Sequence, residues 1–144
     1  MDALVQFLQT SISPVTLISG VGLLVLSMTN RFGRTTDRAR LLAQEVRRDP
    51  QAGAAANLNV QIRILYHRSR VLLFSITLAL ISIFLVSLLV ISLFASSVFG
   101  LDLHIGGGVL FTLSLLSLTA SLALFIHDMS LALSALKLEL QPHL

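Results

Sequence analysis

The sequence contains no cysteine and no tryptophan, and only 12% of its 144 residues are charged. The absence of cysteine excludes disulfide bonds and thiolate metal sites. In an average soluble domain about a quarter of the residues are Asp, Glu, Lys or Arg. The composition is therefore not that of an ordinary soluble protein, although the length is that of one domain.

Charge is missing altogether from three long segments. No Asp, Glu, Lys or Arg occurs in residues 3–30, 71–101 or 103–127. A bilayer core about 30 Å thick needs roughly 20 apolar residues in a helix, so each segment can span a membrane once. We therefore expect an all-α integral membrane protein with a single membrane domain, residues 1–144. Its three transmembrane helices are expected at about residues 12–30, 71–99 and 105–127.

Lysine is almost absent, and the arginines are confined to one stretch. The one lysine is Lys137, and all nine arginines lie between Arg31 and Arg70. Positively charged loops are retained in the cytoplasm, so the N-terminus is expected outside and the C-terminus inside. We expect residues of about 31–70 to form a cytoplasmic helical hairpin between the first and second spans.

Local signals predict where the first helices begin. Ser13 before Pro14 is typical of a helix start, because serine caps the helix and proline suits its first position. Thr35 or Thr36 is expected to cap a separate helix that ends before Pro50. The apolar positions of the two hairpin helices are expected to pack together: Leu41, Leu42 and Val46 against Leu58, Ile62 and Leu65.

The second and third spans are separated by a predicted outer turn. We expect one long helix from about Leu58 to about Phe94, with Asn57 as its cap, after a connector of small residues at 51–56. Three consecutive glycines at 106–108 suit a tight turn or a frayed helix start. The third span then follows from about residue 109.

Hydroxyl and small residues follow one face in two of the expected spans. The face in the third span consists of Ser114, Ser117 and Ser121, continued by Asp128, and the face in the first span consists of Thr16, Gly20 and Ser27. Small and hydroxyl residues let helices approach closely in a membrane. The same faces also suit a water-lined path, so the sequence leaves both interpretations open.

The exclusive use of arginine in the hairpin indicates fixed partners. Lysine would fix the orientation in the membrane equally well, because only positive charge is needed for that. Arginine, in contrast, binds carboxylates and phosphates through two parallel hydrogen bonds. The candidate ion-pair or lipid-phosphate cluster consists of Arg31, Arg34, Asp37, Arg38, Arg40 and Asp128. Within it we expect Asp128 to pair with Arg31, Arg34 or Arg38 as a structural clasp.

The sequence offers no arrangement typical of catalysis. The carboxylates lie at the ends of the spans, and no nucleophile with a base or metal-ligand spacing is present. His67 and His127 fall at similar depth, where two histidines can ligate a haem iron between them. Histidines at a membrane surface are, however, most often ordinary surface residues. We therefore expect no enzyme activity, no cofactor, no metal and no nucleic-acid partner.

One junction resembles a known family. It runs from Ile12-Ser13-Pro14-Val15 through Leu17-Ile18-Ser19-Gly20-Val21-Gly22-Leu23-Leu24 to Thr29-Asn30-Arg31-Phe32-Gly33-Arg34 and Asp37-Arg38-Ala39-Arg40. It resembles a family of small bacterial three-span membrane proteins of unknown function. The resemblance implies a multi-pass protein of the bacterial inner membrane and transfers no activity and no functional residue.

Two functional hypotheses follow, and both include membrane lipid and a homo-oligomer among the partners. In the first, a channel-like assembly has a serine face on its central axis and arginines at a positive cytoplasmic mouth. In the second, a non-conducting scaffold or adaptor uses its arginine-rich hairpin to bind anionic lipid or a cytoplasmic protein.

Overall fold

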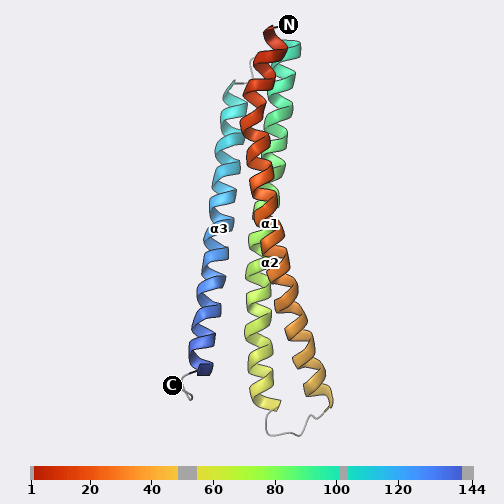
Figure 1. The fold of residues 1–144 in the computed structure, drawn as a ribbon, viewed down its shortest axis with the longest axis vertical. Coiled ribbons are helices and arrows are strands. Elements are labelled where there is room, and N and C mark those ends of the chain that lie inside the picture. The colour runs from red at the N-terminus through yellow and green to blue at the C-terminus, as the bar shows by residue number, and fades with distance from the viewer. Residues whose placement is uncertain (1, 49–54, 101–103, 141–144) are drawn as a thin grey trace. The chain divides into compact units, whose positions relative to one another are not determined.

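The computed structural model describes residues 2–48, 55–100 and 104–140, which form three helices (Figure 1). Helix α1 spans Asp2–Arg48, α2 spans Ala55–Phe99 and α3 spans His104–Leu140. Each helix is long and apolar enough to cross a membrane. The predicted all-helical fold with three candidate spans is confirmed.

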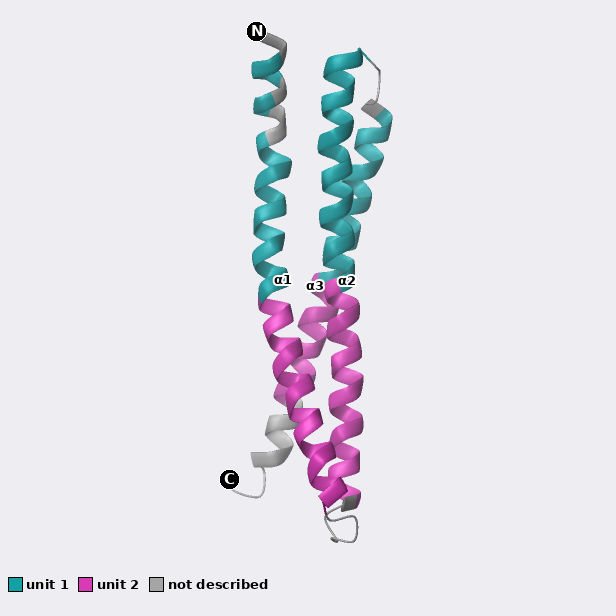
Figure 2. Ribbon diagram, turned by 90° about the vertical axis from the view of Figure 1, so that its right-hand side faces the viewer, with its two compact units in different colours: residues 1–26, 77–121 teal, residues 27–76, 122–144 magenta. Residues whose placement is uncertain are grey.

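Internal contacts divide the residues into two compact units, and every helix contributes to both (Figure 2). The first unit contains residues 1–26 and 77–121. The second unit contains residues 27–76 and 122–144. All nine arginines belong to the second unit, so the two units differ in chemistry although the same three helices build them.

Helix α1 is uninterrupted, which corrects two predicted boundaries. It passes through Pro14, where a helix start was predicted, and through Thr35 and Thr36, where a cap was predicted. Proline removes one backbone N–H, and helices in an apolar setting tolerate this loss when neighbouring helices support them. The Thr35 hydroxyl donates to the carbonyl of Arg31 at 3.0 Å, so it bonds within the helix and caps nothing.

One face of α1 is buried at seven-residue intervals. The buried residues on this face are Pro14, Val21, Met28 and Thr35. A seven-residue repeat is the period of a helix that keeps one seam against its neighbours. The buried seam is thus a different face from that of Thr16, Gly20 and Ser27, which are all exposed.

In the first unit, α2 and α3 pack in an antiparallel arrangement through small residues. Ser117 Oγ donates to the carbonyl oxygen of Leu78 at 2.7 Å. A Cβ atom added to Gly107 would lie 3.4 Å from Leu89 Cδ1. The three glycines belong to the first turns of α3, so of the two predicted alternatives the helix start is correct and the tight turn is wrong. Gly107 is helical because its small size lets the side chain of Leu89 come close.

Helix α2 is the long helix that the sequence predicted, with both ends further out. It begins at Ala55, so Asn57 lies inside the helix. It ends where Gly100 adopts a φ of 65° and donates its N–H to the carbonyl of Ser96 at 3.0 Å, a common helix-terminating bond. Of the expected connector at 51–56, residues 51–54 lie outside the described residues, and Ala55 and Ala56 belong to α2.

In the second unit, α1 and α2 contact each other through mixed apolar and polar groups. Ser75 Oγ donates to Met28 Sδ at 3.7 Å, and both residues are buried. The partly buried residues of the predicted hairpin seam are Leu42, Val46, Leu58, Ile62 and Leu65. Leu41 is 65% exposed, so the prediction that it packs in this seam is wrong.

Candidate functional site: an aspartate held by two arginines

In the second unit, Asp128 of α3 is held by one arginine from each of the other helices. Arg31 Nε donates to Asp128 Oδ2 at 2.9 Å, and Arg68 Nε donates to Oδ1 at 3.1 Å. The Asp128 side chain is fully buried, while those of Arg31 and Arg68 are 24% and 15% exposed. Each carboxylate oxygen therefore has its own charged partner on a different helix.

Seven-residue spacing brings these residues to the interior. On α3 the buried residues Gly107, Ser114 and Ser121 precede Asp128 at intervals of seven. On α2 Arg68 lies seven residues before the buried Ser75. Since residues seven apart lie on nearly the same helix face, Asp128 and Arg68 continue the inward faces of their helices.

The cluster is stabilised by pairing and carries excess positive charge. A carboxylate removed from water is costly unless it is paired and hydrogen-bonded. Asp128 meets that condition with both of its oxygens. Two guanidinium groups face one carboxylate, however, so one positive charge of the cluster has no counter-charge within it.

The structure brings together only part of the predicted cluster. Arg31 and Asp128 are paired. The remaining four members, Arg34, Asp37, Arg38 and Arg40, are exposed. Within the described residues no ion pair joins them. The exposed members remain available to groups outside the chain.

Arg68 was missed by the sequence analysis. The signal that identifies it is the seven-residue series of Arg68, Ser75, Ser82 and Leu89, whose last three members are buried. The equivalent series on the third span, which ends at Asp128, was predicted from the sequence, whereas the series on the second span was not. A helix that packs against a series of serines ending in an aspartate is expected to present small or polar residues at the same seven-residue spacing.

The predicted polar faces have different surroundings. Ser114 is fully buried and donates to the carbonyl of Phe111 at 2.8 Å. Ser121 is also fully buried, and Ser117 bonds to α2 as described above. On α1, by contrast, the exposed Thr16 hydroxyl donates to the carbonyl of Ile12 at 2.9 Å. The serine face is thus used for packing within the chain, whereas the α1 face is exposed.

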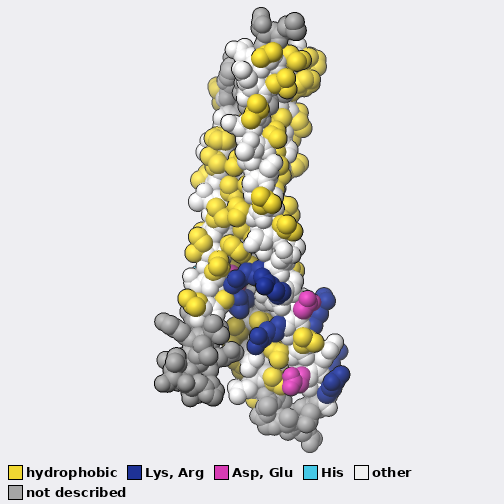
Figure 3. Space-filling model, in the orientation of Figure 1, with side chains coloured by type: hydrophobic (Ala, Val, Ile, Leu, Met, Phe, Trp, Pro, Cys, Tyr) yellow, Lys and Arg dark blue, Asp and Glu magenta, His cyan; other side chains and the backbone are white. Residues whose placement is uncertain are grey.

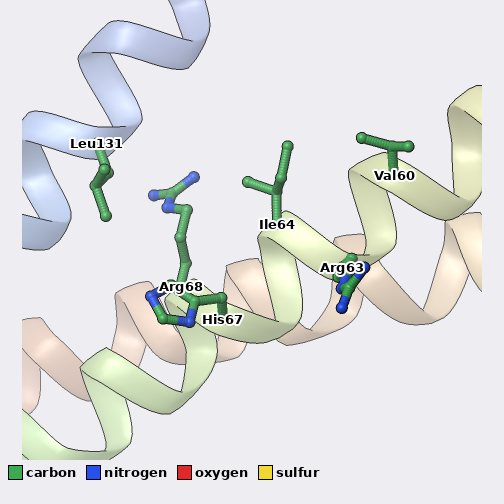
Figure 4. A pocket seen from close by; sticks show the side chains of 6 residues that line it. All are labelled: Val60, Arg63, Ile64, His67, Arg68 and Leu131. Carbon is green, nitrogen blue, oxygen red and sulfur yellow. The ribbon is translucent and has the colours of Figure 1, made fainter.

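Two grooves lie on the second unit. The α2–α3 groove has a volume of about 430 Å³. It is lined by Val60, Arg63, Ile64, His67, Arg68 and Leu131. Figure 4 shows Arg68 extending from α2 toward α3, with Ile64 and Val60 along the same side of α2. This groove therefore adjoins the aspartate cluster.

The α1–α2 groove has a volume of about 460 Å³. Its lining residues are Phe32, Thr36, Ala39, Arg40, Ala43, Ile62, Tyr66, Ser69, Arg70 and Leu73. They include two arginines and three hydroxyl groups but no carboxylate. The lining therefore combines an apolar wall with positive charge.

Exposed arginines dominate the surface of the second unit. Dark-blue side chains gather on it in Figure 3, whereas the rest of the described surface in this view shows hydrophobic side chains interspersed with uncharged atoms. Seven of the nine arginines are exposed: Arg34, Arg38, Arg40, Arg47, Arg48, Arg63 and Arg70. Among the described residues, ion pairs involve only the other two, Arg31 and Arg68.

Three long apolar helices and a buried aspartate–arginine cluster define a multi-pass membrane protein with an arginine-rich unit. The chain belongs to the family described as "Protein of unknown function (DUF2721)", whose model matches residues 11–138. The resemblance seen in the sequence is confirmed. No curated protein and no solved structure matches the chain.

Proposed function

We propose that this protein is a non-conducting scaffold of the bacterial inner membrane whose arginine-rich unit binds anionic lipid at the cytoplasmic surface. The observation that supports the proposal is the set of seven exposed arginines, which have no ion pair within the described residues. Guanidinium groups bind phosphate through paired, charge-assisted hydrogen bonds. Each basic residue near an anionic membrane surface adds about 1 kcal/mol of attraction.

The proposed orientation follows from the same arginines. The positive-inside rule assigns the arginine-rich segment to the cytoplasm, the N-terminus to the outside and the C-terminus to the inside. Anionic lipid of the inner leaflet then faces the second unit. The bacterial inner membrane is proposed because the family resemblance implies it.

Burial of the serine face favours the scaffold over the channel. A channel axis needs polar groups that protomers can share. Ser114 and Ser121 are fully buried within one chain, and the Ser117 hydroxyl donates a hydrogen bond to the backbone carbonyl of Leu78. These side chains therefore stabilise helix packing in a single protomer and are poor candidates for lining a shared axis.

A channel-like homo-oligomer remains the second candidate, and it rests on the other face. Thr16, Gly20 and Ser27 are exposed, and a Cβ added to Gly20 meets no atom within 4 Å. A second copy can therefore approach α1 closely there. The mass of the detergent-purified protein tests assembly through this face: an oligomer that Gly20→Leu converts to monomer supports it, and a wild-type monomer contradicts the channel. Anion flux into proteoliposomes then separates a conducting oligomer from a non-conducting one.

Lipid preference and ion flux test the main proposal. Purified protein is titrated with phosphatidylglycerol and with phosphatidylcholine, and bound lipid is counted by native mass spectrometry. We expect preferential retention of phosphatidylglycerol, lost when all seven exposed arginines become glutamine. Equal retention of both lipids contradicts lipid binding. Anion flux into proteoliposomes above that of protein-free vesicles contradicts the non-conducting scaffold.

A further inference from the structure

The α1–α2 groove has the chemistry of a specific lipid site. We propose that it binds one phospholipid carrying two phosphate groups, with Arg40 and Arg70 on the phosphates and Phe32 and Leu73 against an acyl chain. This inference rests on the proposed function and deepens it, because it names one site and one class of lipid within a broadly cationic surface.

The positive charge of the lining residues favours an anionic ligand in the α1–α2 groove. Arg40 and Arg70 supply two positive charges, and none of the ten lining residues is acidic. Both arginines are exposed and form no ion pair with other described residues. The α2–α3 groove is a weaker candidate because its Arg68 already bonds to Asp128.

The spacing of the two arginines favours two phosphates over one. In this unit α1 and α2 are antiparallel, and Ser75 lies opposite Met28. Counting from that contact places Arg70 level with Gly33, seven residues before Arg40 on α1. Seven helical residues correspond to about 10 Å along the axis. Two phosphates joined by a short linker can pair with both guanidinium groups at once.

Hydroxyl groups between the arginines add hydrogen-bonding capacity. Thr36 Oγ1 is buried and has no hydrogen-bond partner among the described residues. Tyr66 and Ser69 line the same groove from α2. Tyrosine is enriched at membrane surfaces, where its ring contacts apolar groups and its hydroxyl contacts polar ones. Rotation of the Thr36 side chain would allow its hydroxyl to donate to a phosphate oxygen.

The apolar end of the groove lies where an acyl chain is needed. Leu73 belongs to the charge-free segment of α2 that begins at Val71, and its side chain is 52% exposed. Phe32 lines the groove from α1. A volume of about 460 Å³ falls in the range of small-molecule sites. The groove can therefore hold a headgroup and the first part of one chain, while the rest of the chain follows α2.

Competitive titration of the full-length protein in detergent tests the inference. The probes are cardiolipin, which has two phosphates, phosphatidylglycerol, which has one, and phosphatidylcholine, and native mass spectrometry counts bound lipid. Wild-type protein is expected to retain one cardiolipin at concentrations about tenfold below those needed for phosphatidylglycerol. The double variant Arg40→Gln/Arg70→Gln should weaken cardiolipin binding about tenfold or more, since charge-assisted hydrogen bonds are lost.

Matched variants separate the groove from the general charge. Arg47→Gln/Arg48→Gln removes two exposed arginines of α1 outside the groove and should weaken cardiolipin binding much less than the groove variant does, because exposed charges more than about 10 Å apart are largely screened at 0.1 M salt. Ala39→Phe fills the groove without changing charge and should also abolish the preference for cardiolipin. Ala56→Phe, at an exposed position of α2, is the control for Ala39→Phe. This pair of variants tests the groove even if the arginine variant does not fold.

Each alternative outcome overturns a defined part. Equal losses in the two arginine double variants, or an unchanged preference in Ala39→Phe, overturn the groove while general anionic binding stands. Equal wild-type binding of cardiolipin and phosphatidylglycerol overturns the two-phosphate assignment. Equal wild-type binding of all three lipids overturns the proposed function itself.

Discussion

The two units of this protein are made from the same three helices but depend on different interactions. In the first unit the buried groups of α2 and α3 are small or aliphatic, as at Gly107 and Leu89, and the contact between the helices includes a hydroxyl bonded to a backbone carbonyl. In the second unit a buried carboxylate joins three helices. Size is therefore the main constraint in the first unit, and charge balance is the main constraint in the second.

This difference bears on function as well as stability. Among the described buried side chains of the first unit, only the Ser82 hydroxyl lacks a hydrogen-bond partner. The second unit has more arginines than carboxylates and exposes most of them. The interaction with a ligand is accordingly expected in the second unit, while the first unit provides the apolar anchor.

The largest effect is expected from removing the shared carboxylate. Asp128→Ala leaves Arg31 and Arg68 partly buried without a counter-charge, and breaking such a pair costs about 3–5 kcal/mol. We expect a lower Tm in detergent, measured by circular dichroism, and loss of docking between α3 and the other helices of the second unit. Asp128→Asn keeps the shape but not the charge and should recover little of the stability.

Single arginine variants calibrate that result. Arg31→Gln and Arg68→Gln each leave Asp128 with one charged partner, so each should cost less than Asp128→Ala. Replacing both arginines should approach the cost of a buried, unpaired carboxylate. If Asp128→Ala has the same Tm as wild type, the cluster is not a clasp, and the contrast between the units loses its basis.

A size change in the first unit is expected to have the next largest effect. Gly107→Leu forces side-chain atoms past the 3.4 Å Cβ contact with Leu89 Cδ1, and overpacking costs about 1–3 kcal/mol. Gly108→Leu is the matched control, because a Cβ there meets nothing within 4 Å and leucine favours the helix more than glycine does. A Tm that rises equally in both variants would show that helix propensity, and not packing size, decides the outcome at this contact.

The sequence predicted the fold better than it predicted the site. Charge-free segments identify three helices because a bilayer-spanning helix must be long and apolar, and that signal does not depend on tertiary contacts. The long second helix was predicted for the same reason. The boundaries at Pro14 and Thr35 were wrong, as was the turn considered for Gly106 to Gly108, since local capping and turn preferences are weak compared with packing between long helices.

Only part of the site could be predicted from the sequence. Asp128 was identified because it continues a serine series, and Arg31 because it follows the first span. The choice among Arg31, Arg34 and Arg38 depends on which face of α1 is buried, and only the register of three helices decides that. The burial of Met28 and Thr35 turns Arg31 inward and leaves Arg34 outside.

The smallest effect is expected from two serines of the first unit. Ser117→Ala removes the hydrogen bond to Leu78 across the helix contact, and such bonds are worth about 0.6 kcal/mol on average in membrane proteins. Ser82 is equally suited to substitution but has a buried hydroxyl without a partner in the described part of the chain, so Ser82→Ala should be neutral or slightly stabilising. Chemical denaturation of both variants in the same detergent measures the difference. A loss of stability in Ser82→Ala as large as in Ser117→Ala would show that Ser82 has a bonding partner in the membrane, which would add a polar requirement to a unit governed by size.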